Sequence, residues 1–334
     1  MKKINIALIG SGFIQHYHVR GLKSQNEVEL AVVADINLTA ARDFAQQYGI
    51  PEVTDDVLTL TASKKINAAI ISTPNKFHAP YALEFLKNGK DVFVEKPMAI
   101  NFQLGELMAE AAVKFNQLLM VGHMWRFDAE VNYVKDKIVS GELGKIIKTK
   151  GYGIHENWGP GGWFVEKELA CGGALADMGV HAIDTVRYLL GDPQPMQVYA
   201  KIGTYYGHYN VDDTGVLMIS WDNGATSIIE SGWWHPHKDG PEAATQLFGS
   251  KGYASVFPTL IKTSHGKKPG EFKPLMPERE SHCDQLIYTR QMQHFVDCIR
   301  QRKQPIPGFK EGLAVLKIVD AAYESSALGR AVEL

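Results

Sequence analysis

The chain has 334 residues, which is more than one hydrophobic core usually organises, so two domains are expected. A hydrophobic content of 45% and a charged content of 22% are typical of a globular protein, and a net charge of -2 gives no reason to expect nucleic acid or an anionic membrane as a partner. No apolar run approaches the ~20 residues of a membrane helix, and three cysteines without a CxxC pair fit a reducing compartment.

Residues 1–123 alternate between apolar strands and helices. Strands are predicted over 4–10, 28–35, 67–73, 91–96 and 117–122, and helices over 13–24, 38–49, 78–89 and 102–116. Near-continuous apolar strands separated by helices predict a parallel sheet with both faces covered. This part is therefore expected to be a doubly wound, dinucleotide-binding Rossmann domain of the α/β class.

Residues 124–334 follow a different pattern, with short turns between strands as in an antiparallel sheet. Strands are predicted over 146–155, 196–206, 214–221, 225–234 and 243–250, and helices over about 127–140, 173–190, 284–302 and 309–328. The Pro- and Lys-rich residues 265–280 read as a surface loop. We expect an α+β substrate-binding and oligomerisation domain with a large, mostly antiparallel open sheet.

The strand at 214–221 is apolar at consecutive positions, including Val216, Leu217, Met218 and Ile219. Helices can cover only one of its two faces. The other face is expected to meet a second copy of the chain, which predicts a homodimer or homotetramer.

The N-terminal "MKKINIALIG" has one feature of a signal peptide, because two lysines precede an apolar stretch. The stretch is short, contains Asn5 and runs into two histidines without a small-residue cleavage site. It therefore reads as a first strand, and a cytoplasmic location is expected.

The first predicted strand leads into "GSGFIQ", where Gly10 and Gly12 match the first two glycines of a G-x-G-x-x-G motif and Gln15 occupies the third position. The two glycines permit a tight turn and the close approach of backbone to a pyrophosphate at a helix N-terminus. Phe13 and Ile14, which begin that helix, are included in the expected cofactor site.

Asp35 ends the second predicted strand, at the offset expected for an acid that binds the adenosine ribose hydroxyls. Its carboxylate would repel a 2′-phosphate, and Ile36 and Asn37 supply no compensating cation. The sequence therefore favours NAD over NADP as cofactor.

The apolar helix predicted over 173–190 carries Asp177, His181 and Asp184 at i, i+4 and i+7, a spacing that places them on one helical face. Burying such groups costs several kcal/mol unless they pair or react. An imidazole with an ordinary pKa near 6.5 suits proton transfer at neutral pH, and Asp184 can orient it.

Four segments, "STPNKFHAPYA" (72–82), "VEKPMA" (94–99), "GHMWRFD" (122–128) and "GGALADMGVHAID" (172–184), follow one another along the chain. Together they resemble the glucose–fructose oxidoreductase/inositol dehydrogenase (Gfo/Idh/MocA) family over nearly the whole length. Gln15 at the third glycine position is the departure from the family pattern.

The resemblance implies roles for individual residues. Lys96 matches the lysine at the reacting hydroxyl and nicotinamide, Asp177 the substrate-binding acid, and His181 the catalytic histidine. Glu95 matches the acid beside the nicotinamide ribose. The segment that passes along the cofactor is matched by Thr73, Pro74, Asn75 and His78.

Aromatic and polar side chains between these motifs are candidates for holding a polyol. Arg126 and the segment "YGIHENWGPGGWF" (152–164) supply them, and core packing is the alternative for each tryptophan. The expected substrate site comprises Lys96, Arg126, Tyr152, His155, Trp158, Trp163, Asp177 and His181. No metal is expected, because "HYH" (16–18) and "HPH" (235–237) lack a cluster with ligand spacing.

The resemblance implies an NAD-dependent dehydrogenase that oxidises a secondary alcohol of a cyclic polyol, such as an inositol, a sugar or a sugar derivative. One alternative is an NAD-dependent glycosidase acting by transient oxidation, although such proteins usually carry an export signal. The other is a non-catalytic NAD-binding regulatory protein, which the presence of Lys96, Asp177 and His181 disfavours.

Overall fold

The computed structural model describes residues 3–238, 241–263, 270–277 and 284–334. The chain divides into two compact units, Met1–Met124 with Cys283–Leu313, and Trp125–His282 with Ala314–Leu334. Among the described residues, no helix is long and apolar enough to cross a membrane.

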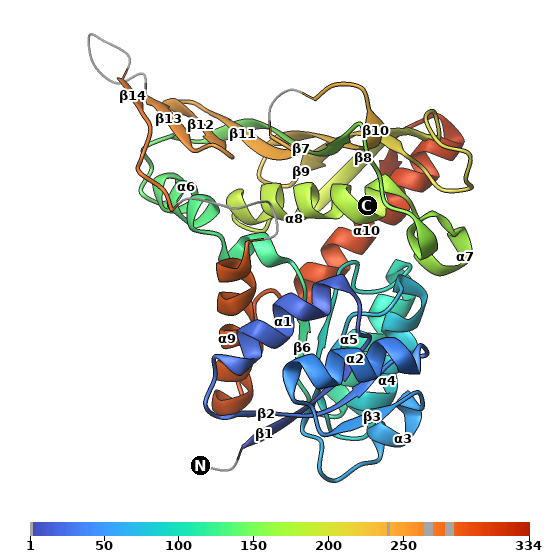
Figure 1. Cartoon of the computed structure of the whole chain (residues 1–334). Helices are drawn as coiled ribbons and strands as arrows, with labels where there is room; N and C mark the ends of the chain where they lie inside the picture. The colour runs from blue at the N-terminus through green and yellow to red at the C-terminus, as the bar shows by residue number, and fades with distance from the viewer. Residues whose placement is uncertain (1–2, 239–240, 264–269, 278–283) are drawn as a thin grey trace. The chain divides into compact units, whose positions relative to one another are not determined.

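The first unit is built on a six-stranded parallel sheet in the order β3-β2-β1-β4-β5-β6 (Figure 1). Its strands are β1 (Ile4–Ile9), β2 (Val28–Ala34), β3 (Glu52–Thr54), β4 (Ala68–Ile71), β5 (Asp91–Val94) and β6 (Leu119–Val121). Its helices are α1 (Phe13–Lys23), α2 (Leu38–Tyr48), α3 (Val57–Thr61), α4 (His78–Lys87), α5 (Phe102–Lys114) and α9 (Gln285–Gln301). The chain leaves β1 toward β2 on one side and continues through β4 on the other, so the carboxyl ends of β1 and β4 flank the switch point where doubly wound sheets bind ligands.

Helix α9 packs on α1 inside the first unit, whereas residues 284–302 were predicted to belong to the second domain. The close approach depends on Gly21, where an added Cβ would lie 3.1 Å from the Cα of Thr289. This long-range helix pairing leaves no local signal in the sequence. The domain boundary between residues 123 and 124 stays a prediction.

The second unit is built on a nine-stranded sheet in the order β14-β13-β12-β11-β7-β10-β9-β8-β15. Only the β7–β10 pair is parallel among the described strands of this sheet. The strands are β7 (Ile146–Glu156), β8 (Pro195–Gly203), β9 (Thr214–Trp221), β10 (Thr226–His235), β11 (Ala243–Gly249), β12 (Gly252–Val256), β13 (Leu260–Thr263), β14 (Gly270–Phe272) and β15 (Val332–Glu333). The helices are α6 (Ala129–Val139), α7 (Lys167–Ala170) and α8 (Val180–Leu189), and α10 (Phe309–Leu328) ends in this unit.

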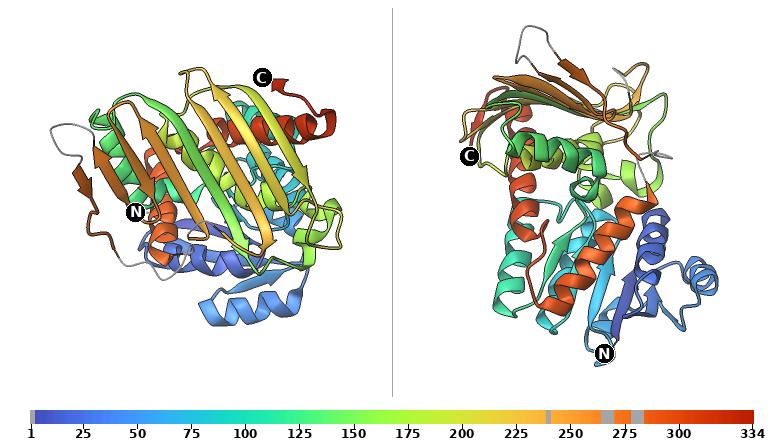
Figure 2. Two further views of the ribbon diagram at one scale, coloured as in Figure 1. Left: turned by 90° about the horizontal axis from the view of Figure 1, so that it is seen from above. Right: turned by 90° about the vertical axis from the view of Figure 1, so that its left-hand side faces the viewer.

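Helix α8 covers the inner face of this sheet, and the left view of Figure 2 shows the strands in front of the helices. The contact is close because Gly151 faces the helix, where an added Cβ would lie 3.0 Å from Val186. Leu217 and Ile219 of β9 are buried in the same core cluster.

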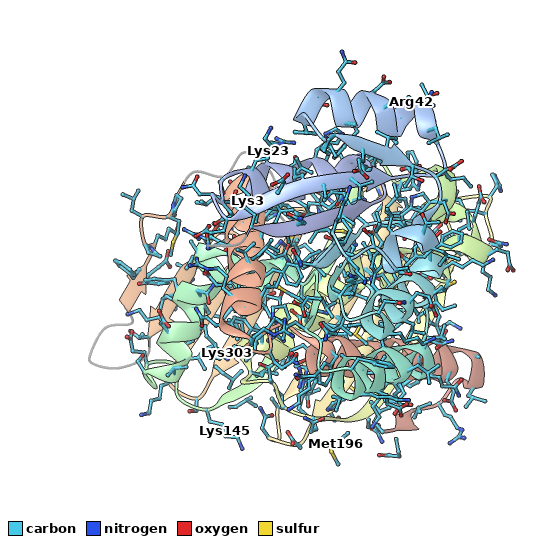
Figure 3. The ribbon with its side chains drawn as sticks, turned by 90° about the horizontal axis from the view of Figure 1, so that it is seen from below. Lys3, Lys23, Arg42, Lys145, Met196 and Lys303 are labelled. Carbon is cyan, nitrogen blue, oxygen red and sulfur yellow. The ribbon has the colours of Figure 1, made fainter. Side chains whose placement is uncertain are left out.

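The outer face of the sheet carries exposed apolar side chains. Val216 and Met218 of β9 are 47% and 46% exposed, whereas their neighbours Leu217 and Ile219 are buried. Met196, at the irregular start of β8 near the end of the sheet, is exposed as well, and its side chain projects from the surface in Figure 3. No described helix covers this face (Figure 2).

These two sheets confirm the expected fold class. The prediction of a surface loop over 265–280 is wrong for Gly270–Phe272, which forms the edge strand β14. Residues 265–269 and 278–280 of this predicted loop lie outside the described part of the chain. Strands β12 and β13 were also not expected, because both are short and only partly buried, so their apolar pattern is weak.

Candidate functional site

The glycine-rich turn lies between β1 and α1, at the switch point of the parallel sheet. Gly10 has a φ of 96°, and an added Cβ would lie 2.7 Å from the carbonyl oxygen of Ser72, so only glycine fits there. Gly12 caps α1 and would meet no atom within 4 Å, which leaves open space at the helix N-terminus. The backbone N–H groups of a helix N-terminus beside open space suit a pyrophosphate.

The departure from the glycine motif is accommodated inside the unit. Gln15 is fully buried, and its side-chain oxygen accepts a hydrogen bond from the hydroxyl of Ser72 at 3.0 Å. The side chain of Gln15 therefore links α1 to the end of β4 by a hydrogen bond, which a third glycine at this position could not make. Phe13 and Ile14 begin α1, and Phe13 is 69% exposed.

Asp35, at the end of β2, is fixed against the glycine-rich turn. Its Oδ2 accepts hydrogen bonds from the backbone N–H and hydroxyl of Ser11 at 2.8 and 2.7 Å, and its Oδ1 accepts one from the N–H of Asn37. Ile36 is 95% exposed. The described side chains thus place a carboxylate, without a cation at position 36, where the adenosine ribose binds in dinucleotide folds.

The segment after β4 is held by His78 at the start of α4. Nδ1 of this ring lies 2.8 Å from the carbonyl oxygen of Pro97, and Nε2 lies 2.9 Å from that of Thr73. Burial lowers the pKa of the imidazole, and the two carbonyls offset part of the shift. His78 therefore joins the segment Thr73–Asn75 to the turn that follows Lys96.

Glu95 and Lys96 follow β5, at the same edge of the sheet. Glu95 is buried, with Oε1 2.8 Å from Nε2 of His18, and Oε2 accepts the backbone N–H of Lys96. Burial raises the pKa of the Glu95 carboxyl, but the His18 ring and the charge of Lys96 lower it more, so its net pKa is below the ordinary value. Sequence reasoning missed His18, which contacts Glu95 across 77 positions of the chain. Gly122 leaves room for this carboxylate, since an added Cβ there would lie 2.8 Å from it.

In the second unit, Asp177 lies in a π-helical turn, Leu175–Gly179, which leads directly into α8. Such turns are rare and occur often at functional sites. The Nε1 of Trp233 donates a hydrogen bond to Asp177 Oδ2 at 3.1 Å. Trp233 is fully buried on β10, so its indole is part of the core of this unit.

His181 lies one turn further, in α8, and is buried. Its ring is tilted by 37° against that of Trp125, with the centroids 5.0 Å apart. The apolar indole surface fixes the plane of the imidazole. Asp177 and His181 thus have different supports, one from β10 and the other from the segment before α6.

Arg126, in the segment before α6, and Asp184, in α8, form a buried ion pair. Arg126 Nη2 lies 2.7 Å from Asp184 Oδ1 and 2.7 Å from Asp192 Oδ1, and its Nε donates to both oxygens of Asp184. Burial lowers the pKa of the guanidinium, but the two carboxylates raise it more, to well above its ordinary value. The guanidinium that was expected to bind substrate is held by these carboxylates.

The structure separates the aromatic candidates of residues 152–164. Gly153 faces the π-turn, because an added Cβ there would lie 3.0 Å from Met178. Successive residues of a strand point to opposite faces, so Tyr152 of β7 lies on the other face of the sheet. The structure therefore does not bring Tyr152 together with Asp177 or His181. His155 is buried beneath Trp158, with the rings 3.6 Å apart and stacked.

Trp163 stacks on Phe164, which packs against the core cluster formed by Ala174, Val211 and Trp233. In the part of the chain that the structure describes, no group of three His, Cys, Asp or Glu side chains could hold a metal ion.

The chain is similar to known proteins over its whole length. Residues 4–123 match the model of an oxidoreductase family with an NAD-binding Rossmann fold, and residues 131–255 match the Gfo/Idh/MocA C-terminal domain. The chain is 29% identical to D-glucoside 3-dehydrogenase of Escherichia coli (strain K12), covering 99% of this chain and 97% of the relative. It is 27% identical to scyllo-inositol 2-dehydrogenase (NAD(+)) of Bacillus subtilis (strain 168), covering 99% and 96%.

Solved structures show the same fold. An oxidoreductase domain protein from Kribbella flavida superposes with a TM-score of 0.91 at 22% identity, covering 100% of this chain and 99% of the other. Levoglucosan dehydrogenase in complex with NADH superposes with a TM-score of 0.90 at 24% identity, covering 99% of both chains. Together with the two matching domain models, these similarities establish that the chain is an enzyme of the Gfo/Idh/MocA family of NAD-binding oxidoreductases.

Proposed function

We propose that this protein is an NAD-dependent dehydrogenase that oxidises a secondary alcohol of a cyclic polyol, an inositol, a sugar or a sugar derivative. The observation that carries the proposal is the Asp177–His181 element, with a half-buried carboxylate and a buried imidazole that each contact an indole. Supporting it, the relatives are named as D-glucoside, scyllo-inositol and levoglucosan dehydrogenases.

Oxidation of an alcohol removes a hydride from carbon and a proton from oxygen. Bound NAD supplies the hydride acceptor. His181 takes the proton, since an imidazole accepts protons readily at neutral pH. The Lys96 ammonium stabilises the developing alkoxide, and Asp177 holds a substrate hydroxyl.

On the cofactor side, we assign the pyrophosphate to the turn at Gly10 and Gly12, and the adenosine ribose to Asp35. The carboxylate of Asp35, already oriented by Ser11, disfavours a 2′-phosphate, so we propose NAD as the preferred cofactor. Glu95, together with the segment Thr73–Asn75, completes this half of the site.

The test is NADH formation with myo-inositol, scyllo-inositol, levoglucosan, D-glucose and methyl D-glucoside, for the natural protein and for His181→Ala. We expect turnover of at least one polyol, and a loss of kcat on the order of 10²–10⁴-fold in the variant. NADH affinity and melting temperature should change little. A folded His181→Ala protein with natural turnover would refute the catalytic assignment.

We also propose that the exposed apolar face of the second sheet joins copies of the chain into a homodimer or homotetramer. Val216 and Met218 lie side by side on this face with Ile228, whose backbone pairs with Met218. Contiguous apolar surface of this kind is uncommon on a monomer.

A further inference from the structure

Asp212, just before β9, is hydrogen-bonded to the chain at the beginning of the π-turn. Its carboxylate is buried and accepts hydrogen bonds from the backbone N–H groups of Gly173 and Leu175, each at 2.8 Å. Its own carbonyl oxygen accepts the N–H of Ala174 at 2.8 Å. Three successive N–H groups of one segment are therefore bound by a single residue of another.

Tyr323 of α10 completes this arrangement. Its hydroxyl donates to Asp212 Oδ1 at 2.6 Å. An added Cβ at Gly172 would lie 2.6 Å from that hydroxyl, and one at Gly173 would lie 1.8 Å from the carbonyl oxygen of Asp212. The two glycines thus allow a contact that no larger residue permits.

The first N–H groups of a helix have no partner inside the helix and need a cap. Ala174, which precedes the π-turn, has no side chain able to provide one. Asp212 supplies the cap from the segment just before β9, so the start of the π-turn is held by a residue distant in sequence rather than by its own sequence neighbours.

Asp213, the residue after Asp212, supports Asp177 indirectly, through Trp233. The carbonyl oxygen of Asp213 accepts the backbone N–H of Trp233 at 2.9 Å, and the indole of Trp233 binds Asp177. The carboxylate of Asp213 binds the N–H groups of Tyr205 and Tyr206 at 2.8 Å, which holds the turn before β9 in place.

We propose that Asp212 and Tyr323 are positioning residues, which fix the start of the π-turn and thereby aim Asp177 at the substrate. The inference rests on the proposed role of Asp177 in substrate binding. A loosened cap lets the first turn of the helix fray, and the carboxylate of Asp177 then samples orientations that do not bind a hydroxyl.

The test uses Tyr323→Phe and Asp212→Asn in the full-length protein. Ser325→Ala is the matched control, because Ser325 is a buried residue of the same helix whose hydroxyl binds Ala200 N and Arg330 O. With the polyol of the panel that gives most NADH, we expect KM to rise about tenfold or more in both test variants, the effect of losing a hydrogen bond to a charged group. NADH affinity should be unchanged, and Ser325→Ala should lower the melting temperature without raising KM.

A double-mutant cycle with Asp177→Asn decides whether the effect passes through Asp177. If it does, Tyr323→Phe has little further effect on kcat/KM in the Asp177→Asn background. Independent, multiplying losses would overturn the positioning role while leaving the proposed function intact. An Asp177→Asn protein with natural kcat/KM would instead overturn the assigned role of Asp177 and the positioning role with it.

Hydrogen exchange gives a readout that needs no substrate. The peptide covering residues 172–182 should exchange faster in Tyr323→Phe than in Ser325→Ala. Equal exchange rates in the two variants would contradict the proposal that Asp212 and Tyr323 stabilise this segment.

Discussion

Arg126 and Asp184 are joined by a buried two-point ion pair, with Nη2 2.7 Å from Oδ1 and Nε 2.9 Å from Oδ2. Both side chains are only 2% exposed. We expect Arg126→Met to cost about 3–5 kcal/mol of unfolding free energy, because it removes the cation that compensates the buried carboxylate of Asp184. Combining it with Asp184→Leu should recover much of the loss.

Urea unfolding of the single and double variants measures these differences. The control is Arg300→Met, which breaks a surface ion pair with Glu27 and should cost no more than about 1 kcal/mol. Equal costs for the buried and the surface pair would contradict this account of α8.

Removing the indole N–H of Trp233, together with part of its ring, tests the orientation of Asp177. Trp233→Phe should lower kcat/KM for the polyol about tenfold or more, since the lost hydrogen bond is made to a charged group. Trp221→Phe is the matched control, because its buried indole donates to Ser227 at 2.6 Å instead. Steady-state kinetics at equal melting temperatures should separate the two variants, and similar kinetic losses would argue for a packing effect alone.

Cofactor choice should depend on the carboxylate of Asp35. We expect the natural protein to prefer NAD over NADP by at least about tenfold in kcat/KM, because a 2′-phosphate would face a like charge. Asp35→Ser with Ile36→Arg should reverse much of this preference, since position 36 is exposed and free to carry a cation. Ile36→Arg alone is the control, and equal use of both cofactors by the natural protein would refute the assignment.

Stability should depend on pH through His78. Burial lowers the pKa of its imidazole below 6.5 in the folded state, so the unfolded chain binds the proton more readily. The contribution of His78 to unfolding free energy is therefore complete above about pH 6.5 and is lost as pH falls toward the lower folded-state pKa. Between about pH 6.5 and 5, the natural protein should lose stability more steeply than His78→Gln. Urea unfolding at each pH measures the slopes, and the exposed His208→Gln should keep the natural slope.

Assembly should depend on the outer face of the second sheet. Val216→Glu with Met218→Lys places charges at two exposed apolar positions of β9 and should convert the protein to monomers at micromolar concentration. Leu58→Glu, at an exposed leucine of α3, should leave the assembly unchanged. Light scattering distinguishes these results, and a monomeric natural protein would count against the proposed interface.

The sequence predicts those parts of the fold and site whose signals are local. The parallel sheet follows from apolar runs such as Ala68–Ile71, all four residues of which are buried. The glycine-rich turn and Asp35 can be found from sequence because the residues that bind a dinucleotide's pyrophosphate and ribose lie within about 30 residues of each other. Edge strands such as β14, whose three residues are exposed, leave no apolar pattern to find.

Long-range supports of the site could not be predicted. Trp233 and Asp177 are 56 positions apart, and Tyr323 and Asp212 are 111 apart. Each of these residues alone is compatible with ordinary core packing, and only the folded sheet shows which pairs meet. The i, i+4, i+7 interpretation of Asp177, His181 and Asp184 also assumed a regular α-helix, which the π-turn interrupts.

The π-turn makes the number of residues between Leu175 and Gly179 matter as much as their identity. Each residue of an α-helix advances the side-chain direction by about 100°, so deleting one residue between Asp177 and α8 would turn the carboxylate of Asp177 away from β10 while α8 stayed packed on the sheet. Surface loops in general tolerate insertions and deletions, whereas an indel here would bring a different side chain to the position that Asp177 now occupies beside Trp233. Among related chains, the length of this short segment should therefore mark a change of substrate before any single substitution does.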